Sequence, residues 1–276
     1  MLHQHPMSTR DVMFVVGNKF DSFASNEGAV TVKQLLKDMK TGNIKNYSKD
    51  TVFLPGQGLQ ESDIECVMQQ AELTECDLVF DLHLRKEQPR RASAVYTHKH
   101  KPENSIISVP RRTISPERFE LDLLVDERSE LMCDHQTGQH VQGMVLIEAA
   151  RQTFLAVTER FFIDAKAGIN YYFVINHMNT EYINFVFPIP VTINYILLDK
   201  KTDNPHRLSF RAMIEFHQAG QVCARVETKF TAFESEKIVQ KEASLAQKAI
   251  KWFHSRHGHH VIGQHSHHGQ ENRAAA

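Results

Sequence analysis

The chain has 276 residues, of which 41% are hydrophobic and 24% charged, and its formal net charge is −1 at pH 7. This length can bury a sizeable core in one large or two small domains. The near-neutral charge argues against a nucleic-acid-binding protein, and no apolar run reaches the roughly 18 residues of a membrane-spanning helix.

The N-terminus has no charged segment followed by an apolar one, so we expect no secretory signal. The cysteines lack the spacing of a metal site and the density of a disulfide scaffold. We expect four reduced thiols in a cytoplasmic protein: Cys66, Cys76, Cys133 and Cys223.

The first part of the chain, residues 1–97, has the pattern of an α/β region of unassigned type. Thr31 suits the start of a helix and Gly42 suits its end. The polar, basic stretch 85–104 is predicted to be a surface connector, so a boundary is expected near 95–104. The expected elements are a buried strand (11–16), a helix (31–42), a loop (48–60), a second helix (61–74) and a weak strand (77–84).

Residues 98–235 have a different pattern, in which one long apolar helix at 142–162 is followed almost entirely by strands. Gly220 marks a hairpin turn, and Pro188 and Pro190 predict a bend. A helix that is apolar on nearly all sides is buried, so the sheet should wrap around it. This predicts an α+β hotdog fold, with strands at 105–110, 118–126, 170–179, 181–199, 206–218 and 221–233.

The C-terminal part, residues 236–276, starts as an amphipathic helix with Ile238, Leu245, Ala249 and Trp252 on one stripe. It continues into a tract with seven histidines between His254 and His268. Such a tract either binds zinc or nickel or is a solvated end. We predict a disordered, non-catalytic tail and no metal site.

The buried helix carries three polar residues, Glu148, Arg151 and Gln152, on neighbouring parts of one face. A charge held away from water is costly unless it is paired. Two interpretations remain open. The residues form either an internal pair that fixes a dimer interface or the polar part of a catalytic site.

The loop before this helix contains Asp134, His135, His140 and Gly143. Gly143 allows close backbone approach, and the first helical amides are unpaired donors that can form an oxyanion hole for a thioester carbonyl. Asp134 can orient the His135 imidazole for proton transfer. His140 is either part of this mouth or a structural hydrogen-bonding residue.

The stretch DHQTGQHVQGMVLIEAARQ (134–152) resembles the signature of the A-factor biosynthesis (AfsA-type) hotdog family, D-H-x-x-G-Q-H-V/I-x-G-M-x-L-x-E-A-x-R-Q. HKHKPENSII (98–107) resembles its second marker. The resemblance covers about 98–235. It implies an enzyme that acts on acyl thioesters, as the γ-butyrolactone synthases do when they transfer a β-ketoacyl group from acyl carrier protein to dihydroxyacetone phosphate.

The resemblance also implies roles for individual residues. Glu148 would be the general base on the acceptor hydroxyl, and the Gly143 amide would hold the oxyanion. Arg151 would bind a phosphate or Glu148, and His135 would position the acyl group or relay a proton. Gln152, His140 and Asp134 are further candidates for substrate binding. No cofactor is implied.

The same stretch is similar to β-hydroxyacyl-carrier-protein dehydratases, but its spacing between His135 and Glu148 is one residue shorter. The synthases carry two hotdog repeats, whereas this chain has one signature, so a homodimer is expected to complete the double hotdog.

Two other functions therefore stay open beside acyl transfer. The first is a thioesterase or dehydratase acting on a carrier-protein or CoA thioester. The second is a non-catalytic module that binds an acyl chain or carrier protein. The basic stretch 85–101 is either a docking surface for an acidic carrier protein or a solvated face.

Overall fold

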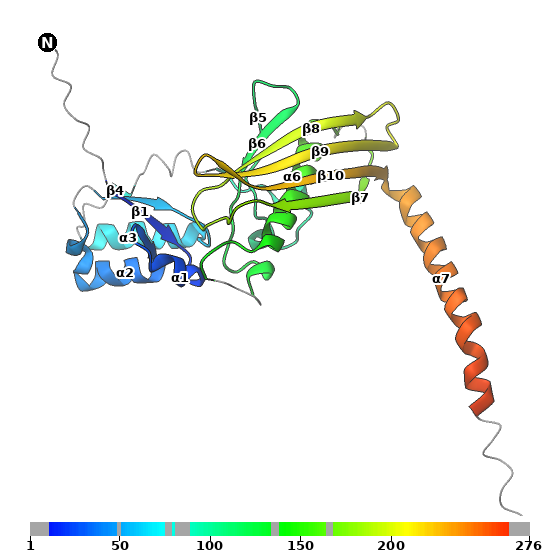
Figure 1. The fold of residues 1–276 in the computed structure, drawn as a ribbon, viewed down its shortest axis with the longest axis horizontal. Helices are drawn as coiled ribbons and strands as arrows, with labels where there is room; N and C mark the ends of the chain where they lie inside the picture. Colours follow the sequence, from blue (N-terminus) through cyan, green and yellow to red (C-terminus); the bar gives the residue numbers. More distant parts are fainter. Residues whose placement is uncertain are drawn as a thin grey trace, which may run out of the picture.

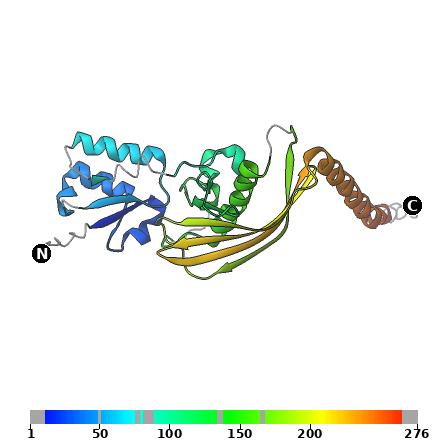
Figure 2. The ribbon, with the colours of Figure 1, turned by 90° about the horizontal axis from the view of Figure 1, so that it is seen from above.

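The computed structural model describes residues 11–48, 51–74, 79–80, 89–133, 138–163 and 168–264, and of 79–80 and 257–264 the backbone alone. Two regions lie side by side, and a long C-terminal helix projects from the second (Figure 1). The first region is a small parallel sheet with helices. The second is a curled antiparallel sheet around one helix, as Figure 2 shows from above.

The N-terminal sheet has the order β2-β1-β3-β4, and all its pairs are parallel. Helices α2 and α3 pack against each other, and Leu35, Phe53 and Val67 are buried in the core of this region. The strands are β1 (Val12–Val16), β2 (Ala29–Thr31), β3 (Val52–Pro55) and β4 (Val79–Phe80); the helices are α1 (Asp21–Ala24), α2 (Val32–Thr41) and α3 (Glu61–Leu73).

Local signals gave the right helix ends here. Thr31 caps α2 by accepting a hydrogen bond from the Gln34 amide at 3.2 Å, and Gly42 ends it at φ 76°. The loop expected at 48–60 is wrong, because this stretch contains β3, one of the two inner strands of the sheet. The strand has only four residues. Pro55 and Gly56, which directly follow Leu54, are typical of loops and made the strand hard to recognise in the sequence.

The second region has the strand order β5-β6-β8-β9-β10-β7, with every pair antiparallel. Alternate residues of β9 are buried against α6, and the Phe154 ring of α6 stacks on Phe230 at 4.2 Å. The elements are β5 (Arg111–Arg112), β6 (Arg118–Asp122), α6 (Gly143–Phe161), β7 (Tyr171–Tyr182), β8 (Thr192–Lys201), β9 (Arg207–Gln218) and β10 (Gln221–Glu234). This is the expected hotdog fold.

Three expectations for this region need correction. Residues 105–110 form isolated bridges instead of a strand, with Ile106 and Ile107 fully buried. The strand expected at 181–199 is interrupted between Tyr182 and Thr192, around the two prolines. The connector expected at 85–104 is not a plain surface loop, because within it α5 (Ala94–Thr97) packs against α6.

The two regions meet at the carboxyl ends of β1 and β3. Gln57, 4% exposed, donates to the Leu123 carbonyl at 3.0 Å and accepts from the Val125 amide at 2.8 Å. Gly56 lies so close that a Cβ there would be 2.3 Å from the Pro188 carbonyl oxygen. Side chains at these positions are therefore restricted by contact between the regions.

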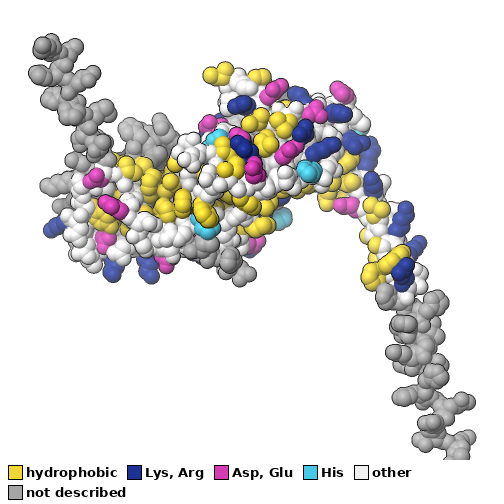
Figure 3. All heavy atoms as spheres, in the orientation of Figure 1, with side chains coloured by type: hydrophobic (Ala, Val, Ile, Leu, Met, Phe, Trp, Pro, Cys, Tyr) yellow, Lys and Arg dark blue, Asp and Glu magenta, His cyan; other side chains and the backbone are white. Residues whose placement is uncertain are grey.

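The C-terminal helix α7 (Ser235–Gln264) is longer than expected, since it continues through part of the histidine tract. The prediction of disorder directly after the amphipathic segment is wrong as far as residue 264; His265, His267 and His268 lie outside the described residues. Leu245 and Trp252 are each 53% exposed, and apolar and basic side chains appear together along α7 (Figure 3). Within the described ranges, no helix is long and apolar enough to span a membrane.

We predict that Gln57→Ala destabilises the protein by about 2 kcal/mol, because the buried Leu123 carbonyl and Val125 amide lose their partner. Urea unfolding measures this, with Gln69→Ala on the exposed side of α3 as the control. Equal unfolding midpoints for the two variants would show that the hydrogen bonds of Gln57 do not hold the two regions together.

Candidate active site

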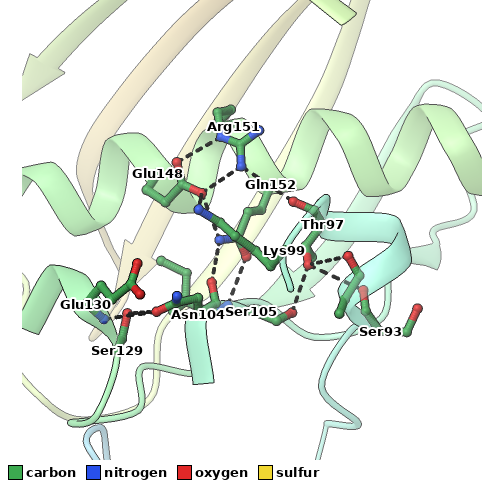
Figure 4. A network of polar contacts seen from close by, with 12 residues as sticks. Ser93, Thr97, Lys99, Asn104, Ser105, Ser129, Glu130, Glu148, Arg151 and Gln152 are labelled. Carbon is green, nitrogen blue, oxygen red and sulfur yellow. Dashed lines mark hydrogen bonds and ion pairs between the residues drawn. The ribbon is translucent and has the colours of Figure 1, made fainter. Parts of the chain in front are cut away.

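Glu148 on α6 is the centre of a compact polar network (Figure 4). Its carboxylate, 16% exposed, accepts hydrogen bonds from Arg151 Nε at 2.8 Å and Nη2 at 2.9 Å, and from Gln152 Nε2 at 2.9 Å. Lys99 Nζ lies 2.8 Å from the same carboxylate. The three polar residues of the helix therefore act together, and a second cation joins them.

Lys99 comes from the chain segment after α5, and it is a site residue that sequence reasoning did not single out. It lies in the second family marker, HKHKPENSII, so the marker itself was the available signal. The ion pair shows that the two markers meet in space. Lys99 and Arg151 are 25% and 27% exposed, so both cations remain accessible to a small molecule.

Gln152 joins α6 to this segment. It is fully buried, donates to the Asn104 carbonyl at 2.8 Å and to Glu148, and accepts from the Ile106 amide at 2.9 Å. Its amide is engaged on both sides, so its geometry suits the positioning of Glu148 better than contact with substrate.

The network determines the charge of Glu148. Burial by itself would raise the pKa of this carboxyl, but the hydrogen bonds from Arg151, Lys99 and Gln152 outweigh burial and lower the pKa below its ordinary value. The carboxylate is consequently ionised at neutral pH and is a weak base while all its donors are in place.

An apolar pocket of about 660 Å³ opens at the start of α6. Gly143, Met144 and Leu146 line it from the helix, Tyr182 from the end of β7, and Phe185 from the segment after that strand. Its size and apolar lining are those of a small-molecule site.

Gly143 is among the residues that line this pocket, and its role in substrate binding stays a prediction. A Cβ at this position would be 2.8 Å from the ring of Tyr182, so the close approach that glycine allows is to this tyrosine. The first amides of α6 are near the pocket, where a carbonyl oxygen would meet the positive end of the helix.

Gln142 is a second residue that sequence reasoning missed. It precedes α6, lines the pocket, and its side-chain nitrogen is buried without a hydrogen-bond partner among the described residues. A buried donor without an acceptor is costly, which favours a ligand oxygen as its partner. No sequence signal marks this residue, since it occupies a variable place in the family signature.

The pocket and the Glu148 network are neighbours on α6. Met144 lines the pocket, and Glu148 and Arg151 follow it at helical spacing, so all three share one face. Met144 is 61% exposed, so this face is open in the single chain.

The remaining candidates are placed only in part. His140 lines the pocket, where its ring lies 4.8 Å from that of Phe185. Asp134 and His135 lie outside the described residues, so their roles remain predictions. Among the residues the structure does describe, no cluster of three or more His, Cys, Asp or Glu side chains could hold a metal ion.

The lowered pKa of Glu148 predicts how stability depends on pH. Its contribution is complete above the unfolded pKa near 4.3 and is lost as the pH falls through the lower folded value. Glu148→Gln should therefore flatten the acid limb of the stability curve. At pH 7 it should cost about 2 kcal/mol, because Lys99 and Arg151 lose their counter-charge.

Urea unfolding from pH 3 to 7 measures both effects. The matched control is Glu159→Gln, also on α6, which removes an ion pair with His98 but leaves the Glu148 network intact. A Glu148→Gln curve with the wild-type slope and midpoint would contradict the assignment.

Comparison with known proteins identifies the second region. The model of the A-factor biosynthesis hotdog domain matches residues 81–234, more than half of the chain. No protein of curated function matches the chain.

Solved structures resemble it at low identity. A putative thioesterase from Shewanella oneidensis is 9% identical, with 49% of this chain and 91% of that chain covered and a TM-score of 0.37. A conserved protein from Pseudomonas aeruginosa is 16% identical (52% and 96% covered, TM-score 0.35). A putative thioesterase related to phenylacetic acid degradation from Ralstonia eutropha is 18% identical (55% and 98% covered, TM-score 0.35). On the family match, the chain belongs to the A-factor biosynthesis hotdog domain family.

Proposed function

We propose that the protein is an acyl-thioester enzyme that transfers an acyl group from acyl carrier protein or CoA to a small phosphorylated, hydroxylated acceptor such as dihydroxyacetone phosphate. The observation that carries the proposal is the arrangement on α6. An apolar pocket for the acyl chain lies one helical turn from a carboxylate held between two accessible cations.

The pocket supplies the acyl half of the site. The acyl chain lies among the apolar side chains, and the thioester carbonyl oxygen faces the start of α6. There the Gly143 amide and the Gln142 side-chain nitrogen donate to the oxygen as it becomes negative.

The Glu148 network forms the part of the site that binds the acceptor. The phosphate of the acceptor binds Lys99 and Arg151 and draws both away from Glu148. The carboxylate then has fewer donors, so its pKa rises and it becomes a better base. Glu148 takes the proton of the acceptor hydroxyl, whose oxygen attacks the carbonyl; the C–S bond breaks and the thiolate leaves with a proton. His135 would position the acyl group or relay that proton.

The active form is a homodimer in this proposal. β7 is the last strand of the sheet, and Tyr172, Ile175 and Tyr182 along it are each at least 39% exposed. An open strand edge with exposed apolar side chains favours pairing with a second copy. The second copy would then cover the open face of α6.

A second candidate function is a non-catalytic module that binds an acyl chain or a carrier protein. The observation in its favour is that Glu148 accepts hydrogen bonds from three side chains and has a lowered pKa, which suits a structural ion network. The same experiment separates the two functions.

The test is intact-mass spectrometry of a β-ketoacyl-loaded carrier protein incubated with the protein, alone, with dihydroxyacetone phosphate, or with dihydroxyacetone. We expect the carrier to be unloaded only with the phosphorylated acceptor. Glu148→Gln should lower the rate about a hundredfold or more, because the general base is lost. Glu159→Gln should keep the wild-type rate.

The other outcomes are equally informative. Unloading without an acceptor would mean a thioesterase, and water loss from a hydroxyacyl carrier would mean a dehydratase. Equal rates with dihydroxyacetone would contradict activation of Glu148 by phosphate. A carrier that stays loaded in every arm would favour the binding module.

A further inference from the structure

A second pocket, of about 280 Å³, lies where the two regions meet. The carboxyl end of β3 and the start of α3 line one side through Leu54 and Ile64, and the hotdog region lines the other through Leu124 and Val191. In open parallel sheets, ligands bind outside the carboxyl ends of the strands, next to the point where the strand order reverses. In the order β2-β1-β3-β4 that point is between β1 and β3.

The pocket contains one guanidinium, that of Arg91. Its Nη1 donates to the backbone carbonyls of Ser105 and of Leu124, the latter at 2.6 Å. A guanidinium has five N–H donors, so these two bonds leave others for a ligand. No carboxylate in the described ranges lies within ion-pair distance of Arg91, although the side chain is partly buried. Asp126 and Glu61 oppose its charge only from beyond ion-pair distance, so the remaining N–H donors suit an anionic ligand group.

One carboxylate of the same pocket, that of Glu61, is exposed and opposes the Arg91 charge only at a distance. Glu61, at the first position of α3, forms no ion pair with any described cation and does not reach Arg91. The other, Asp122, is neutralised by Arg111 at 2.7 Å. The pocket therefore presents one positive and one negative group that do not touch each other, with apolar walls between them.

We propose that this pocket binds a zwitterionic α-amino acid with an apolar side chain. The ligand carboxylate binds Arg91, its ammonium group binds Glu61, and its side chain lies against Leu54, Ile64 and Leu124. The volume of about 280 Å³ has room for a small amino acid. The bound amino acid touches both regions and bridges them.

The site is independent of the thioester chemistry, because none of its lining residues belongs to the Glu148 network or to the pocket at α6. It therefore stands whatever reaction the hotdog region performs.

The test is isothermal titration of the full chain with L-leucine, L-valine, L-methionine and L-phenylalanine. Two analogues each keep one charge: 4-methylpentanoate lacks the ammonium group, and 3-methylbutylamine lacks the carboxylate. We expect at least one of the amino acids to bind, and each analogue of leucine to bind about tenfold or more weakly than leucine.

Variants assign the two charges. Arg91→Met should weaken leucine and 4-methylpentanoate but not the amine, and Glu61→Gln should weaken leucine and the amine but not the acid. Since Arg91 also holds two backbone carbonyls, Ile64→Trp provides a variant without polar contacts that fills the pocket and should abolish binding. The matched control is Leu73→Trp on the same helix, where the side chain is 79% exposed.

The proposal is overturned if none of the four amino acids binds the wild-type chain at millimolar concentration. It is equally overturned if Ile64→Trp binds as tightly as Leu73→Trp, or if 4-methylpentanoate binds as tightly as leucine.

Discussion

The ion network of Glu148 is the interaction on which the arrangement of the hotdog region depends. A carboxylate inside a mostly apolar helix can stay charged only if cations and hydrogen-bond donors surround it. Arg151 and Gln152 come from the helix itself, but Lys99 comes from a separate segment, which Gln152 holds in place through Asn104 and Ile106. The charge of Glu148 therefore depends on the folding of that segment against α6.

This constraint also explains why the connector between the two regions is ordered by α6. Thr97 is fully buried, and its carbonyl accepts from Arg151 at 3.4 Å. Arg91, slightly earlier in the chain, holds the Leu124 carbonyl at 2.6 Å. The same segment therefore touches the Glu148 network at one end and the pocket between the regions at the other. The polar composition of this connector predicted a solvated loop. Composition gives no information on which backbone carbonyls accept hydrogen bonds from arginine side chains.

Signals that are local in sequence predicted structure well, and signals that depend on distant partners did not. The Thr31 cap, the Gly42 stop and the hairpin at Gly220 follow from a few adjacent residues, and the apolar length of α6 required a wrapped sheet. By contrast, β3 is a four-residue strand whose identity depends on pairing with β1 and β4. Gln142 matters only because other segments surround it, and no pattern along the chain singles it out. Lys99 was marked only by its place in the second family marker, and its contact with Glu148 depends on the fold.

Under the proposed transfer, the lowered pKa of Glu148 accounts for the need for an anionic acceptor. A neutral alcohol would leave Lys99 and Arg151 on the carboxylate, which then has little tendency to accept a proton. A phosphate competes for both cations and raises the basicity of Glu148 when the acceptor hydroxyl arrives. Water cannot do so, which also protects the thioester from hydrolysis. Selectivity in this site would therefore arise from charge, through the protonation behaviour of one residue, more than from the shape of the pocket.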